Sequence, residues 1–139
     1  MAITPEQTAA IVGAVGEAFG RVLPPGFELR AHEDALALTS PATLAVYYIG
    51  ENIGHRLESG RPPVEAVRHA IESLAMDLQD GVTEEVTYPW PKDHRLRKSE
   101  FAFPHTRIQD GAVIVWFGRE EDALTPPIRI PLPAELAGG

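Results

Sequence analysis

The sequence has no cysteine, and this absence excludes disulfide bonds, thiolate metal sites and cysteine nucleophiles. It also lacks any apolar run near the ~20 residues that a membrane-spanning helix needs. The N-terminus lacks the positively charged and apolar segments of a secretory signal. We therefore expect a cytoplasmic protein without a membrane partner.

The motifs of the common enzyme classes are missing as well. The chain has no GxSxG nucleophile motif, no GxxxxGK[ST] phosphate loop, no GxGxxG dinucleotide motif and no HExxH zinc motif. These absences lower the expectation of a hydrolase or a nucleotide-dependent enzyme. They leave open whether the protein is an enzyme, and the sequence indicates no cofactor.

Lysine is absent from residues 1–90, where five arginines stand against thirteen acidic residues. Residues 91–139 carry seven basic and seven acidic residues, so the net charge of -8 arises entirely in the first part. An acidic surface repels phosphate backbones and attracts basic proteins, which disfavours nucleic acid as a partner. The simpler interpretation is that the acidity keeps a small domain soluble.

The composition, 44% hydrophobic and 23% charged, is that of an ordinary globular protein. Residues 107–118 contain the most apolar stretch of the chain. Asp110 and Gly111 form a strong hairpin-turn signal, because glycine adopts the positive φ that tight turns require. The run from Val113 to Phe117 predicts a central strand buried on both faces. Residues 101–108 are its predicted partner, with Pro104 marking an edge.

The first helix is predicted over residues 5–22. Thr4 is a suitable N-cap, Pro5 suits the first helical position, and Gln7 is placed to close a capping box. Its face opposite the apolar stripe carries small residues: Ala9, Gly13, Gly16 and Gly20. That face favours a close contact with a second helix or a symmetry mate, or else a marginal helix held by its apolar side alone.

The middle of the chain predicts a hairpin and then two helices. Residues 27–31 and 35–39 alternate with period two around the loop 32–34. Residues 44–49 have the composition of a strand, but the spacing of apolar residues from 42 to 57 favours a helix, and we predict the helix. A second helix over 64–80, ended by Gly81, would be its antiparallel neighbour.

Strands are predicted over residues 82–88 and 128–132, and a fraying tail over 134–139. The sequence therefore predicts a single α+β domain over residues 1–139. In chain order this domain has an N-terminal helix, a hairpin, an antiparallel helix pair, and a mainly antiparallel sheet built on the 101–117 hairpin, with the helices on one face.

Two groups of polar residues invite a chemical interpretation. Glutamate and histidine recur at i, i+4 and i+7 in two triplets, like ligand sets inside helical bundles: Glu51, His55 and Glu58, and Glu65, His69 and Glu72. Both triplets lie opposite the apolar stripes, which favours solvated faces, and we predict no metal. His32 beside Glu33 and Asp34 resembles a base with an orienting carboxylate, but adjacent turn residues rarely face each other.

The predicted partner-binding or anion-binding site is a basic segment that follows a proline-flanked tryptophan. It consists of Trp90, Lys92, His94, Arg95, Arg97 and Lys98. Such a segment reverses the local field of an acidic protein and guides an anionic partner to one place. The alternative is a solvated loop with Trp90 folded onto the core.

These observations favour a small acidic cytoplasmic protein-binding module without catalysis, such as an adaptor, a secretion-type chaperone or an immunity-like protein. The expected partner is another protein, and the small-residue helix face together with the edge strands favours a homodimer. The alternative is a small enzyme with a His/Glu or metal-assisted site.

Overall fold

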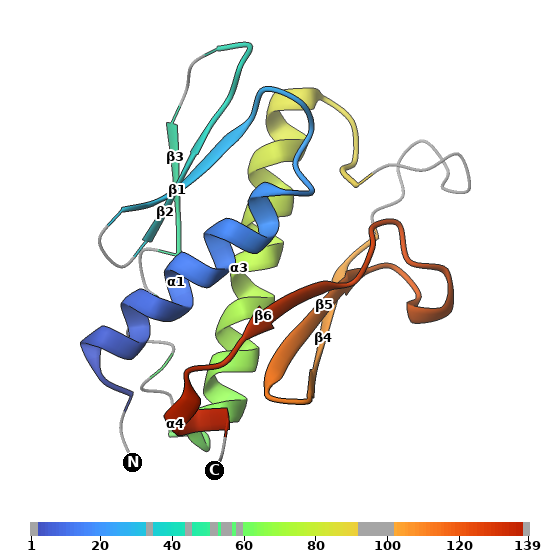
Figure 1. Ribbon diagram of the computed structural model, residues 1–139. Helices are drawn as coiled ribbons and strands as arrows, with labels where there is room; N and C mark the ends of the chain where they lie inside the picture. Colours follow the sequence, from blue (N-terminus) through green and yellow to red (C-terminus); the bar gives the residue numbers. More distant parts are fainter. Residues whose placement is uncertain are drawn as a thin grey trace.

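A computed structural model of the chain describes residues 3–32, 35–43, 46–50, 53, 57, 60–91 and 102–137. Within these residues the fold is an α+β mix of helices and two three-stranded antiparallel sheets (Figure 1). The elements in chain order are α1 (Pro5–Gly20), β1 (Glu28–His32), β2 (Ala35–Thr39), β3 (Val46–Ile49), α3 (Pro63–Val86), β4 (Pro104–Gln109), β5 (Ala112–Phe117), the 3₁₀ turn η1 (Glu120–Asp122), β6 (Ile128–Pro131) and α4 (Ala134–Ala137). The strands thus form two sheets instead of the one predicted.

Helix α1 begins with the predicted capping box. The backbone N–H of Gln7 donates to Thr4 Oγ1 at 3.1 Å, and the backbone N–H of Thr4 donates to Gln7 Oε1 at 2.9 Å. The helix ends at Gly20, two residues earlier than predicted. Gly16 faces β2, where a Cβ atom would lie 3.0 Å from Leu36 Cδ2. This glycine therefore permits a close contact with a sheet, not with a second helix.

The hairpin β1–β2 confirms the prediction for residues 27–39, with Leu29 opposite Leu38. His32 pairs with Ala35 and so belongs to the strand instead of the loop. Strand β3 adds to β2 with Leu36 opposite Ile49 and completes the first sheet.

The helix predicted over residues 42–57 is wrong at residues 46–49, which form β3. All four of these residues are β-branched or aromatic and pair with β2, and this tertiary pairing outweighs the helical spacing. Gly50 ends the strand with a φ of +75°, a conformation that a helix interior does not allow. Ile53 and Leu57 are helical and buried, and the residues around them lie outside the described part of the chain. The antiparallel helix pair is therefore not established.

Helix α3 passes through Gly81 and continues to Val86, so the strand predicted over residues 82–88 is wrong. Leu74, Leu78 and Val82 are buried at helical spacing, and this continuous apolar face outweighs the helix-breaking tendency of one glycine. A Cβ atom at Gly81 would lie 3.2 Å from Leu38 Cδ2, so here too a glycine lets a helix approach β2. The C-cap residue Thr87 takes a left-handed φ of 63° and terminates the helix.

The second sheet contains the predicted hairpin, with Asp110 at φ 50° and Gly111 at φ 74° in the turn. Strand β5 lies in the middle, between β4 and β6. Its inward side chains, including Val113 and Phe117, are fully buried, whereas Ile114 and Trp116 are half-buried. The prediction of burial on both faces is therefore corrected.

The remaining predictions for this region concern its edges and its tail. Pro104 lies on β4, an edge strand, as predicted, and β6 forms the opposite edge over the predicted residues. Residues 134–137 of the predicted tail instead form α4, whose Leu136 is buried next to α3.

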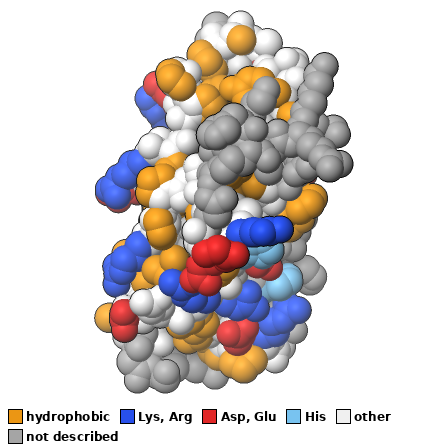
Figure 2. Space-filling model, turned by 90° about the vertical axis from the view of Figure 1, so that its right-hand side faces the viewer, with side chains coloured by type: hydrophobic (Ala, Val, Ile, Leu, Met, Phe, Trp, Pro, Cys, Tyr) orange, Lys and Arg blue, Asp and Glu red, His pale blue; other side chains and the backbone are white. Residues whose placement is uncertain are grey.

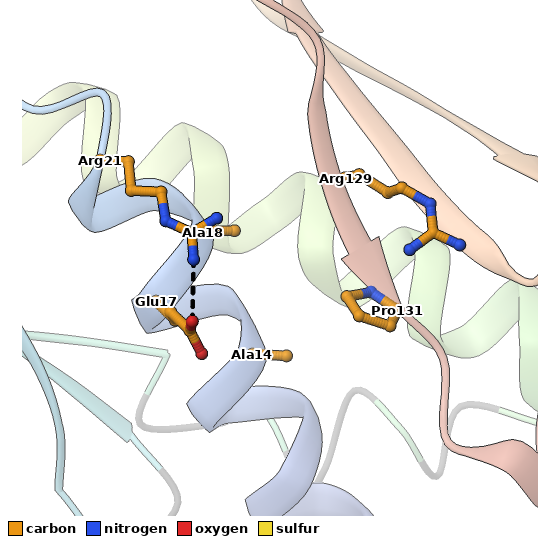
Figure 3. A pocket seen from close by; sticks show the side chains of 6 residues that line it. All are labelled: Ala14, Glu17, Ala18, Arg21, Arg129 and Pro131. Atoms are coloured by element: carbon orange, nitrogen blue, oxygen red, sulfur yellow. Dashed lines mark hydrogen bonds and ion pairs between the residues drawn. The ribbon is translucent and has the colours of Figure 1, made fainter.

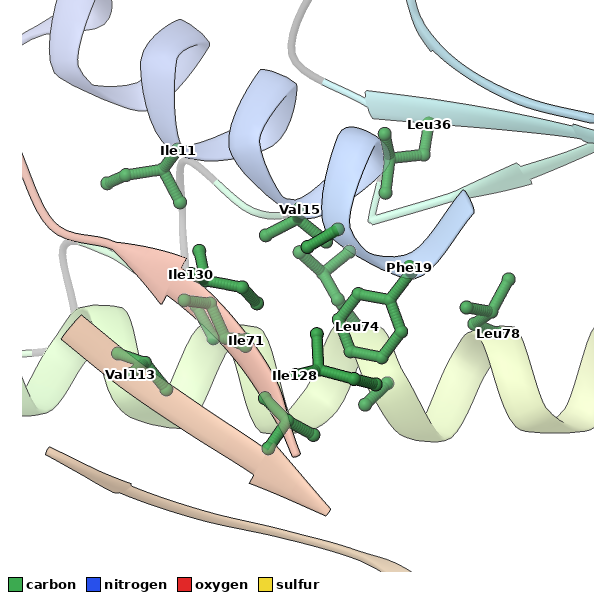
Figure 4. Packing of buried hydrophobic residues seen from close by; sticks show 14 of the residues in the cluster. Ile11, Val15, Phe19, Leu36, Ile71, Leu74, Leu78, Val113, Ile128 and Ile130 are labelled. Carbon is green, nitrogen blue, oxygen red and sulfur yellow. The ribbon is translucent and has the colours of Figure 1, made fainter. Parts of the chain in front are cut away.

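The core lies where α1 and α3 meet both sheets (Figure 4). Figure 4 shows side chains from both helices and from β2, β5 and β6 turned toward one another: Ile11, Val15, Phe19, Leu36, Ile71, Leu74, Leu78, Val113, Ile128 and Ile130. The core thus contains residues from the two sheets. The outward sides of the strands carry polar groups and half-buried aromatic side chains.

Candidate functional site

Trp90 is the one member of the predicted site that the structure describes. Its side chain is 6% exposed and makes an edge contact with Phe117, with ring centroids 5.6 Å apart. Its backbone N–H donates to Thr83 Oγ1 at 3.1 Å. This is the core packing that sequence analysis raised as the alternative for Trp90. Lys92, His94, Arg95, Arg97 and Lys98 lie outside the described residues, and their role stays a prediction.

Two glutamates of the triplet on α3, Glu65 and Glu72, belong to a hydrogen-bond network between the helix and β4. Arg68 donates to Glu65 Oε2 from Nε at 3.0 Å and to Thr106 Oγ1 from Nη1 at 2.9 Å. Thr106 in turn donates to Glu72 Oε1 at 3.2 Å. The two carboxylates are thus part of a polar bridge between helix and strand, a structural role that sequence spacing did not predict.

No set of three potential metal ligands gathers among the residues that the structure describes. The other triplet, Glu51, His55 and Glu58, lies outside them. So do Glu33, Asp34 and the side chain of His32, so their predicted arrangement is not tested.

A cluster of hydroxyl groups surrounds Glu85 near the end of α3. The Glu85 carboxylate accepts hydrogen bonds from Thr43 Oγ1 and from the Tyr47 hydroxyl, the latter at 3.0 Å. Hydrogen bonds from Thr43 and then Ser40 hold the pKa of Glu85 below its ordinary value. The hydrogen bond to Glu85 is also the main cause that raises the pKa of Tyr47. The cluster connects the first sheet to α3.

The second sheet has an outward face on which aromatic and cationic side chains meet. The register places His105 opposite Trp116 and Arg107 opposite Ile114. We call these four residues the outer sheet face. Phe103, just before β4, is 56% exposed. Figure 2 shows this side of the molecule, where basic, acidic and histidine side chains gather beside hydrophobic ones.

Trp116 is the centre of the outer sheet face. The His105 ring lies against it with centroids 5.7 Å apart and planes inclined by 32°, and the guanidinium carbon of Arg107 lies 5.4 Å from the Trp116 ring centroid. Arg107 is held there by Gln109, whose Oε1 accepts from Nε at 2.9 Å, and by an ion pair with Glu120. The arrangement is a cation–π platform on a rigid strand pair.

Sequence analysis missed this face because the run from Val113 to Phe117 suggested burial on both sides. The available signal was the alternation in the partner strand, where His105, Arg107 and Gln109 occupy every second position. When one strand carries polar residues on one side, that side of the sheet faces solvent. The residues of the paired strand on the same side then face solvent as well.

Comparisons with known proteins add no assignment: no family model matches the chain, and neither curated proteins nor solved structures gave a match. Among the described helices, none combines the length and the apolar character that crossing a membrane requires.

Proposed function

We propose that the protein is a non-catalytic protein-binding module that binds an acidic segment of another protein through its outer sheet face. The observation that carries this proposal is the position of Trp116 between His105 and Arg107 on an outward strand surface. Tryptophan and arginine are the residues that most often dominate binding energy at protein interfaces. An adaptor, a secretion-type chaperone and an immunity-like protein would each use such a surface.

The electrostatics support an acidic partner. The chain as a whole carries a net charge of -8, so a cationic site stands out against a surface that repels acidic proteins elsewhere. Within the part of the chain that the structure describes, Gln109 accepts from Nε of Arg107 and Glu120 pairs with Nη1, so Nη2 can donate to an incoming carboxylate. Because the guanidinium is already held over the indole, little side-chain entropy is lost on binding.

The basic segment that contains Lys92, Arg95 and Arg97 precedes β4 in the chain. We propose that its cations bind further carboxylates of the same partner. Trp90, by contrast, supports the site from within through its contact with Phe117.

The homodimer stays a proposal as well. A Cβ atom at Gly13 or Gly20 would have no described atom outside its own helix within 4 Å, so this side of α1 leaves space for a second copy, whereas Gly16 already packs against Leu36.

The two tryptophans allow a direct test of the proposed site. In protein labelled with 5-fluorotryptophan, a peptide of alternating glutamate and phenylalanine should shift the ¹⁹F signal of Trp116 and leave that of Trp90 unchanged. A matched peptide of lysine and phenylalanine should shift neither signal. Binding should weaken as salt is added, since the contacts are between exposed charges.

Two charge reversals give a matched comparison. Arg107 and Arg30 are both strand arginines paired with a glutamate, Arg107 with Glu120 and Arg30 with Glu28 at 3.3 Å. Arg107→Glu should lower the affinity for the acidic peptide by roughly tenfold or more, the loss typical of an interface hot spot. Arg30→Glu, on the first sheet, should leave the affinity unchanged. Equal losses in the two variants would contradict the proposed site.

A further inference from the structure

A groove lies between α1 and β6, at the edge of the second sheet away from β4 (Figure 3). Its volume is about 320 Å³, at the lower end of the range for small-molecule sites, roughly 300–1,000 Å³. Six residues line it: Ala14, Glu17, Ala18 and Arg21 from α1, and Arg129 and Pro131 from β6.

The groove exists because small side chains stand where the helix passes the strand. Ala14 and Ala18 lie one helical turn apart on α1, and Pro131 ends β6 opposite them (Figure 3). The larger apolar residues of the same helix, such as Val15 and Phe19, are buried in the core instead. The floor of the groove is therefore apolar and shallow.

Arg21 lies on the α1 side of this floor and Arg129 on the β6 side, where the guanidinium of Arg129 is turned away from α1 (Figure 3). Arg21 pairs with Glu17 at 2.8 Å, and these side chains are 72% and 74% exposed. Arg129 donates from Nη2 to the backbone carbonyl oxygen of Asp110 at 3.2 Å, and no carboxylate of the described residues pairs with it. Arg129 can therefore accept an outside carboxylate without first giving up an ion pair.

We propose that this groove binds a small amphipathic monocarboxylate, with its aliphatic chain on Ala14, Ala18 and Pro131 and its carboxylate between Arg21 and Arg129. Arginine binds carboxylates in bidentate fashion, and an apolar floor bounded by cations matches a molecule with one charged end. The site uses none of the four residues of the outer sheet face. The register nevertheless places Arg129 opposite Ile114, so the groove borders that face, and substitutions on the α1 side of the groove are needed to separate the two sites.

Titration of the full chain with hexanoate, followed by ¹H–¹⁵N NMR, tests the proposal. Hexanoate should cause saturable shifts at the amides of Ala14 and Ala18 and at the Arg129 side chain. The matched uncharged probe, 1-hexanol, should bind at least tenfold more weakly. If hexanol and hexanoate shift the same signals with equal affinity, the carboxylate assignment is overturned.

Three variants locate the site. Arg129→Gln should lower the affinity for hexanoate at least tenfold. Arg30→Gln, which removes the same charge from the first sheet, should leave that affinity unchanged. Glu17→Gln should raise the affinity for hexanoate severalfold, because it releases Arg21 from its ion pair with Glu17. Unchanged affinity in both Arg129→Gln and Glu17→Gln would overturn the proposal.

A fourth variant separates groove binding from general attraction to positive charge. Ala14→Leu keeps every charge and fills the apolar floor, and circular dichroism reports whether the helix content is retained. Hexanoate binding should then be lost in the folded variant, while retained binding would place the carboxylate elsewhere.

Discussion

At the scale of single residues, Glu85 has an environment that depends on pH. Its carboxylate accepts hydrogen bonds from Thr43 and Tyr47, and its pKa lies below the ordinary value of 4.5. A group whose pKa is lowered by folding stabilises the folded state above its unfolded pKa. That contribution is lost as the pH falls through the folded pKa.

We therefore expect wild-type protein to melt at a higher temperature than Glu85→Gln at pH 7. The difference should shrink as the pH falls below 4.5, because the wild-type carboxylate then becomes neutral too. Melting curves of both proteins at pH 7 and pH 3 measure the effect. A difference that stays constant between these pH values would contradict the assigned role. Glu84→Gln, a neighbouring substitution for which no hydrogen bond is described, is the control.

Ile114 and Phe117 show how far the burial of a single residue can be predicted from the sequence. Both belong to the apolar run of β5, and hydrophobicity alone assigned both to the core. Phe117 is fully buried, whereas Ile114 is half-buried beside Arg107 on the outer sheet face. The side of the sheet on which each residue lies depends on how β5 pairs with β4. The sequence of β5 alone therefore does not determine it.

We expect Phe117→Ala to lower the free energy of unfolding by about 3–5 kcal/mol, the usual cost for a buried phenylalanine. Ile114→Ala should cost clearly less than the roughly 2–5 kcal/mol of a fully buried isoleucine, because its surroundings are partly solvent. Urea unfolding of the two variants measures the difference. Equal losses would mean that the outward face of β5 is as well packed as the inward face.

At the scale of elements, local signals predicted best where few tertiary contacts compete. The capping box of α1 and the Asp110–Gly111 turn are determined by neighbouring residues, and both are confirmed. Residues 46–49 and 82–86 were assigned wrongly because their conformation depends on β2. Strand pairing turns the first segment into β3, and packing on Leu38 lets α3 run through Gly81.

The glycines of α1 give a test at this scale. Gly13→Ala should stabilise the protein by up to about 1 kcal/mol, since alanine is the better helix former and no described atom outside the helix lies within 4 Å of the new methyl group. Gly16→Ala should give little or none of this gain, because its methyl group would press on Leu36 at 3.0 Å. Thermal unfolding of the two variants decides the matter. A larger gain at Gly16 than at Gly13 would contradict the packing of α1 on β2.

At the scale of the whole molecule, the charge distribution predicts which residues attract an acidic partner. Reversal of Arg95 and Arg97 to glutamate should weaken binding of an acidic partner and reduce its salt dependence, with the melting temperature unchanged. An internal role for these cations would instead lower the melting temperature. The acidic peptide proposed for the outer sheet face serves as the probe, and Arg30→Glu serves as the control.

Both long helices approach strand β2 at a glycine, α1 through Gly16 on Leu36 and α3 through Gly81 on Leu38. These leucines are two residues apart on the same side of β2, so any local opening that lifts β2 must loosen both helices at once. Amide hydrogen exchange in rising denaturant should therefore show the amides near Gly16 and near Gly81 losing protection together. If one helix lost protection well before the other, the two contacts would be energetically independent, and β2 would not couple the opening of the two helices.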